Sequence, residues 1–228
     1  MAAPKLIIFD CDGVLVDSEP ISIGVLLDVL AREGRVIEEE AAYRHFLGRS
    51  MATISKQLES EFDFVITEEH LEDIRHELYQ RFRKELQPIR NIRATLEQLT
   101  VPYCVASSSQ PERIRLSLEV AGLLDLFERH IYSAVMVRHG KPAPDLFLHA
   151  AREMGVAARD CIVVEDSPAG IKAAKRAGMP VFAFHGGSHD RGGVLAADLS
   201  ALHPDRIFDD MRSLPRLLEE RSRGEDRG

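Results

Sequence analysis

The stretch LIIFDCDG, residues 6–13, joins a short apolar run to two acids and a glycine. Its first four residues are apolar, which is typical of a short strand buried on both faces. Asp10 and Asp12 follow two positions apart, so their carboxylates can point to the same side of the sheet. Gly13 then permits a sharp turn. Open α/β sheets bind ligands at this end of their strands, so the pair suits a divalent cation, a nucleophile and a general acid in one cluster.

Apolar runs and helix-type segments alternate along much of the chain. Four further strands are predicted, at residues 102–106, 130–134, 161–164 and 181–184. Helical patterns and Pro, Ser and Gly helix-boundary signals separate them. This alternation predicts an α/β fold with a doubly wound, mainly parallel sheet. No strand is predicted between residues 18 and 87, where apolar residues recur at helical spacing.

Four segments resemble the motifs of the haloacid dehalogenase superfamily, in its large phosphatase and phosphomutase branch. Residues 10–19, DCDGVLVDSE, resemble motif I. VASSS at 105–109, KPAPD at 141–145 and VEDSPAG at 164–170 resemble motifs II, III and IV, in that order. The resemblance covers nearly the whole chain. It implies a Rossmann-like catalytic core at 1–17 and 88–220 and a small α-helical cap at 18–87, inserted after the first strand. The polar tail, 221–228, is expected to be disordered.

The resemblance also implies a reaction. Asp10 would be the nucleophile that forms an aspartyl-phosphate, and Asp12 would be the general acid and then the general base. Ser107, Ser108 and Lys141 would bind the phosphate. Lys141 would supply a point charge to the phosphoryl group and to the nucleophile.

A Mg²⁺ ion is the cofactor that the resemblance implies. Its expected ligands are Asp10, the backbone carbonyl of Asp12, and Asp166, because Mg²⁺ prefers a few oxygen ligands. Glu165 is either a further metal ligand or a partner of the ligands. Cys11 lies between the two acids of motif I, but on a strand its side chain faces away from theirs, so we expect it to pack in the core.

Composition limits the partners. The 228 residues carry a formal net charge of −8, which argues against a nucleic acid or an anionic membrane as partner. We expect a small phosphorylated molecule as substrate, and either a monomer or a weak dimer. Three cysteines without CxxC spacing favour reduced thiols in a cytoplasmic protein.

Two weaker signals lie outside the four motifs. Gly48 and Arg49 break the helical pattern of the cap, where this family often carries specificity residues, although an exposed helix-end arginine explains Arg49 equally well. The segment HGGSH, residues 185–189, contains two histidines. Its glycines predict a flexible loop near the pocket rather than a second metal site.

Two other functions remain open beside a Mg²⁺-dependent phosphatase of a sugar or polyol phosphate. A β-phosphoglucomutase-like phosphosugar mutase would share motifs I and IV, but such mutases typically carry a histidine where this chain has Ser22 and an arginine where it has Met51. A catalytically silent binding module would keep the fold. Such modules usually lose a nucleophile, lysine or metal acid, and here all are present.

Overall fold

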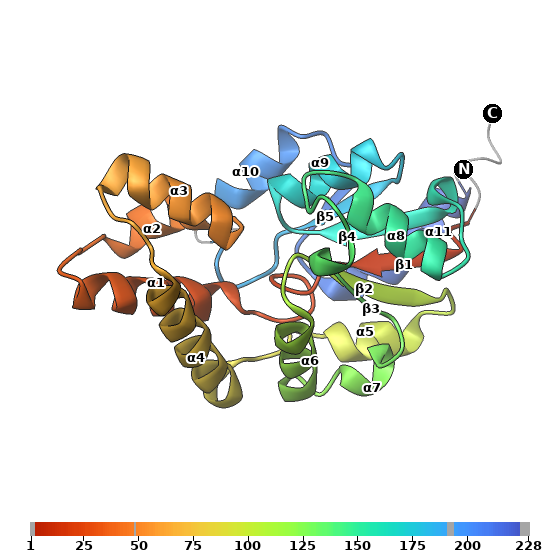
Figure 1. The fold of residues 1–228 in the computed structure, drawn as a ribbon. Helices are drawn as coiled ribbons and strands as arrows, with labels where there is room; N and C mark the ends of the chain where they lie inside the picture. Colours follow the sequence, from red (N-terminus) through yellow and green to blue (C-terminus); the bar gives the residue numbers. More distant parts are fainter. Residues whose placement is uncertain (1–2, 48, 191–193, 224–228) are drawn as a thin grey trace. The chain divides into compact units, whose positions relative to one another are not determined.

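The computed structural model describes residues 3–47, 49–190 and 194–223 (Figure 1). Contacts along the chain divide it into two compact units. One unit comprises Met1–Asp17 together with Gln87–Gly228, and the other comprises Ser18–Leu86. The first unit contains the sheet, and the second is helical.

The sheet has six parallel strands in the order β3-β2-β1-β4-β5-β6. Their bounds are Leu6–Phe9 (β1), Tyr103–Ser107 (β2), Ile131–Ser133 (β3), Cys161–Glu165 (β4), Val181–Phe184 (β5) and Arg206–Phe208 (β6). The α/β class, the parallel sheet and the first five strands are as predicted from the sequence. We did not predict β6, because it is three residues long and two of them are exposed at the sheet edge. Such a segment carries no apolar run.

The helices of the first unit lie on both faces of the sheet (Figure 1). Their bounds are Ile92–Gln98 (α5), Pro111–Val120 (α6), Leu124–Phe127 (α7), Asp145–Glu153 (α8), Pro168–Arg176 (α9), Val194–Ser200 (α10) and Leu214–Arg223 (α11). Helix α11 includes the first three residues of the tail segment 221–228, and residues 224–228 lie outside the described part of the chain.

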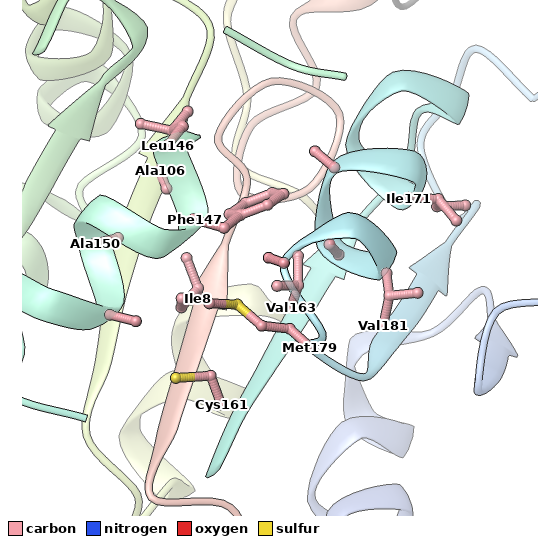
Figure 2. Packing of buried hydrophobic residues seen from close by; sticks show 14 of the residues in the cluster. Ile8, Ala106, Leu146, Phe147, Ala150, Cys161, Val163, Ile171, Met179 and Val181 are labelled. Atoms are coloured by element: carbon pink, nitrogen blue, oxygen red, sulfur yellow. The ribbon is translucent and has the colours of Figure 1, made fainter. Parts of the chain in front are cut away.

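Alternate residues of β1 face two different cores. Leu6 and Ile8 pack against α8, which contributes Leu146, Phe147 and Ala150 (Figure 2). On the opposite face, the ring of Phe9 meets the ring of Phe127 in α7 at 6.4 Å between centroids. All four residues of β1 are fully buried, as expected for a central parallel strand covered on both sides.

The strand register brings the motifs to one edge of the sheet. Phe9 pairs with Val105 in β2 and with Val164 in β4. The backbone N–H of Asp10 donates to the carbonyl of Val164 at 3.0 Å. Residues that follow these three strands therefore leave the sheet at the same level.

The described residues of the second unit, 18–47 and 49–86, form four helices. Their bounds are Glu19–Arg32 (α1), Glu39–Phe46 (α2), Met51–Phe62 (α3) and Glu68–Glu85 (α4). Thr67 and His70 form a reciprocal capping box at the start of α4, and Ser50 caps α3. Ser18, which precedes α1, makes no side-chain capping bond. Within the described residues, no helix combines the length and the apolarity needed to cross a membrane.

Candidate active site

Lys141 connects two acids at the edge of the sheet. Its ammonium donates to Asp10 Oδ1 at 2.7 Å and to Glu165 Oε1 at 2.7 Å. The lysine side chain is 4% exposed, and the ammonium also lies 4.8 Å from the centroid of the Phe147 ring. A lysine with this little exposure is held at one point rather than left to sample solvent, so its charge is fixed beside the carboxylate of Asp10.

The charges of Asp10 and Lys141 are set by opposing effects. Burial raises the pKa of Asp10 to about 7, Lys141 acts against this, and Glu165 and Asp12 add to it. Burial by itself would lower the pKa of Lys141, but the two carboxylates outweigh it and the pKa is raised. Lys141 is therefore a permanent cation. A divalent ion beside Asp10 would add a second positive charge and favour the ionised carboxylate.

Glu165 has both of its oxygens bound by protein donors. Oε1 accepts from Lys141, while Oε2 accepts from the backbone N–H of Ser167 at 2.7 Å and from its hydroxyl at 2.9 Å. The Ser167 hydroxyl in turn accepts from the N–H of Gly170 and so caps α9. A Cβ at Gly170 would stand 1.7 Å from Glu165 Oε1. These contacts tie Glu165 to Lys141 and to the start of α9, and the choice between its two predicted roles stays a prediction.

Three carboxylates could hold a cation here. One oxygen from each of Asp10, Glu165 and Asp166 lies within 4.8 Å of the others, and all three residues are buried. The loop after β1 approaches this group closely, because a Cβ at Gly13 would stand 1.8 Å from Asp166 Oδ2. Gly13 also has a φ of +79°, which glycine adopts without strain. An all-oxygen donor set suits a hard divalent metal, so the residues fit the group.

The carboxylate of Asp12 is bound by donors from β2, from the loop after it and from α6. Its Oδ1 accepts from Arg113 Nη2 at 2.8 Å, and its Oδ2 accepts from the hydroxyls of Ser109 at 2.7 Å and Ser107 at 3.4 Å. Sequence reasoning assigned no role to Arg113 or Ser109. One signal for Arg113 was available, because a cation in the first turn of a helix opposes the helix dipole unless an anion lies nearby.

The two serines predicted to bind phosphate differ in their exposure to solvent. Ser107 is 1% exposed and lies at the end of β2, beside Asp12. Ser108, in contrast, is exposed. The Cys11 thiol is buried, as expected.

Arg49, one of the weaker sequence signals, lies shortly before α3 in the helical unit. Arg49 donates to Gln57 Oε1 at 2.8 Å, and the Gln57 amide contacts His45 Nδ1 at 2.8 Å. Gly48 lies outside the described residues.

The loop 185–189 makes polar contacts with residues on either side of it and with motifs I and IV. His185 Nδ1 lies 3.0 Å from Asp190 Oδ2, and the N–H of Ser188 donates to Asp17 Oδ1 at 3.2 Å. His189 is 4% exposed, and its Nε2 lies 3.7 Å from Asp166 Oδ2. These contacts join the loop to motif I and motif IV residues, and its flexibility stays a prediction.

Comparisons with known proteins agree with this geometry. A family model described as haloacid dehalogenase-like hydrolase matches residues 7–184. The 6-phosphogluconate phosphatase of Escherichia coli is 30% identical over 223 residues, which cover 97% of each chain. Hexitol phosphatase A of Escherichia coli is 31% identical, covering 79% of this chain and 83% of its own. A crystal structure of a conserved haloacid dehalogenase-like protein from Agrobacterium tumefaciens is 36% identical and superposes with a TM-score of 0.85, covering 96% of this chain and 99% of that one.

The chain belongs to the haloacid dehalogenase-like hydrolases and, within them, to the phosphoric monoester hydrolases. The family and the class of enzyme predicted from the four motifs are therefore confirmed. Its acidic cluster at Asp10, Glu165 and Asp166 can hold the divalent metal that such phosphatases use.

Proposed function

We propose that this enzyme is a Mg²⁺-dependent phosphatase that hydrolyses a small sugar or polyol phosphate through an aspartyl-phosphate at Asp10. The observation that carries the proposal is the buried contact between the Lys141 ammonium and Asp10 Oδ1. A carboxylate fixed beside a permanent cation at the carboxyl edge of a parallel sheet is suited to attack an anionic phosphoryl group.

The reaction would proceed in two displacements at phosphorus. In the first, an oxygen of Asp10 forms a bond to phosphorus, the ester bond breaks, and Asp12 gives a proton to the departing alcohol. In the second, Asp12 takes a proton from water, the water oxygen attacks phosphorus, and the Asp10 carboxylate is released with inorganic phosphate. Lys141 and the hydroxyl of Ser107 would hold phosphoryl oxygens in both displacements.

Mg²⁺ would be held by Asp10, Asp166 and the backbone carbonyl of Asp12. It would neutralise phosphoryl charge and keep the nucleophile ionised. The all-oxygen donor set and the burial of the acidic cluster support this assignment. The contacts of Glu165 with Lys141 and Ser167 support a positioning role for that residue.

The substrate class rests on two lines of support. The curated relatives named above are a 6-phosphogluconate phosphatase and a hexitol phosphatase, both acting on phosphorylated sugar derivatives. The second line is the family resemblance, which implies that the helical unit is a cap for a small substrate, with Arg49 as a specificity residue. Three buried free cysteines are compatible with the reducing cytoplasm.

The test is phosphate release from a panel of sugar, sugar-acid, hexitol and nucleotide monophosphates, with Mg²⁺ and with EDTA. We expect release from sugar-acid or hexitol phosphates that requires Mg²⁺ and disappears in Asp10→Asn. The exposed Asp209→Asn variant is the matched control and should retain activity. Absence of release from every compound, together with conversion of glucose 1-phosphate to glucose 6-phosphate, would replace the phosphatase with a mutase.

A further inference from the structure

The carboxylate of Asp12 occupies a set of donors that resembles an anion-binding site. A guanidinium binds one oxygen and two hydroxyls bind the other, with Arg113 at 2.8 Å, Ser109 at 2.7 Å and Ser107 at 3.4 Å. A carboxylate and a phosphoryl group present similar acceptor oxygens, and a planar guanidinium binds both. The donors therefore do not distinguish the protein's own acid from a substrate anion.

These donors are held in place by the surrounding structure. The backbone N–H of Ser109 donates to Ser107 Oγ at 3.1 Å, and the fully buried Ser133 donates its hydroxyl to the carbonyl of Ser109 at 2.6 Å. Arg113 is the third residue of α6, and its side chain is 22% exposed. An arginine in the first turn is disfavoured by the helix dipole, and here the carboxylate of Asp12 offsets this effect.

Asp12 and the substrate phosphate compete for the same hydrogens. A serine hydroxyl has one hydrogen to donate, and in this structure Ser107 and Ser109 both direct theirs to Asp12. In the proposed reaction, on which this inference rests, the Ser107 hydroxyl binds the phosphoryl group while Asp12 exchanges protons with the leaving alcohol and water. The contacts of Asp12 seen here cannot all persist once the phosphate is bound.

We propose that Arg113 and Ser109, together with Ser107, form a phosphoryl-binding subsite that Asp12 fills in the absence of substrate. Binding of the substrate phosphate then transfers these donors from Asp12 to the phosphoryl oxygens. Asp12 is thereby released for proton transfer only when a phosphate is present. Arg113 becomes a substrate-binding residue rather than a fixed partner of the general acid.

A double-mutant cycle tests the exchange, with inorganic phosphate as the probe and Mg²⁺ held constant. Phosphate affinity is measured by titration calorimetry for wild type, Asp12→Ala, Arg113→Met and the double variant. Asp12→Ala empties the subsite, so we expect it to bind phosphate more tightly than wild type. In that background Arg113→Met should weaken binding by about tenfold to a hundredfold, the effect of one charged hydrogen bond. In wild type the loss should be smaller, because Arg113 exchanges one anion for another.

Arg115→Met is the matched control, because Arg115 lies on the same helix, carries the same charge and is exposed. It should change phosphate affinity by less than about twofold in either background. Ser109→Ala provides a second, smaller deletion within the subsite if Arg113→Met proves unstable by circular dichroism. It should weaken phosphate binding in the Asp12→Ala background by several-fold.

If Arg113→Met and Arg115→Met are indistinguishable in the Asp12→Ala background, Arg113 only orients Asp12 and the inference is wrong. Release of phosphate from sugar phosphates by wild type would still support the proposed function in that case. Failure of wild type to release phosphate from any substrate would instead contradict the proposed function and, with it, the subsite.

Discussion

Glu165 and Lys141 form an ion pair at 2.7 Å in which the side chains are 0% and 4% exposed. The pair joins the end of β4 to the loop before α8, two segments that are 24 residues apart in the chain. Because Lys141 also contacts Asp10, the position of Glu165 determines where the positive charge lies relative to the proposed nucleophile.

Lys141→Met should greatly reduce phosphate release and also destabilise the fold. Removing one preorganised charge from a buried site typically costs a hundredfold or more in kcat. Leaving Asp10 and Glu165 buried without their cation should cost about 3 kcal/mol of unfolding free energy. Steady-state kinetics and urea unfolding measure the two effects. Lys172→Met, at an exposed lysine of α9, should stay within about 0.5 kcal/mol of wild type.

Gly170→Ala and Gly24→Ala should have opposite effects on stability, although both replace a helical glycine. The new Cβ at position 170 would overlap Glu165 Oε1, so overpacking should cost about 1–3 kcal/mol. At position 24 the nearest atom is the end of the flexible Arg81 side chain, at 3.0 Å, and alanine favours the helix by about 0.5–1 kcal/mol. Urea unfolding of the two variants measures the difference. Equal destabilisation of both would contradict the tight packing at Glu165.

Asp166→Asn should weaken cation binding while leaving the fold intact. Removal of one carboxylate from three converging acids lowers the charge available to Mg²⁺, so a higher Mg²⁺ concentration should be needed for half-maximal phosphate release. The Mg²⁺-dependent rise in melting temperature should shrink in parallel. EDTA should abolish activity of the wild type, and added Mg²⁺ should restore it. An unchanged Mg²⁺ dependence in Asp166→Asn would place the cation elsewhere.

The three thiols should react slowly with Ellman's reagent in the folded protein and rapidly after unfolding. All three cysteines are buried, and burial raises the pKa of Cys161 to about 11 and that of Cys11 well above its usual value. Because a raised pKa keeps a thiol protonated until the pH approaches it, the native reaction should remain slow even at pH 9. Rapid titration of one thiol in the native enzyme would contradict the core position of that cysteine.

The sequence alone determined the fold class and the family. Apolar runs followed by acidic or serine-containing turns identify central parallel strands, because a strand covered on both faces must be apolar throughout. The family motifs named Asp10, Ser107 and Asp166 in advance, and the strand register places the ends of β1, β2 and β4 at one edge of the sheet. Strand β6 could not be predicted, because an exposed edge strand of three residues has no such pattern.

Which cationic side chain contacts which carboxylate became clear only from the folded structure. Motif patterns name Glu165, Asp12 and Lys141, but the partner of each depends on which side chains meet after folding. Arg113 reaches Asp12 across 101 positions of sequence, and Lys141 reaches Glu165 across 24. Local periodicity carries no information about contacts at such separations, because they arise from the stacking of strands and helices. The electrostatics of the site is therefore a property of the assembled sheet edge rather than of any single motif.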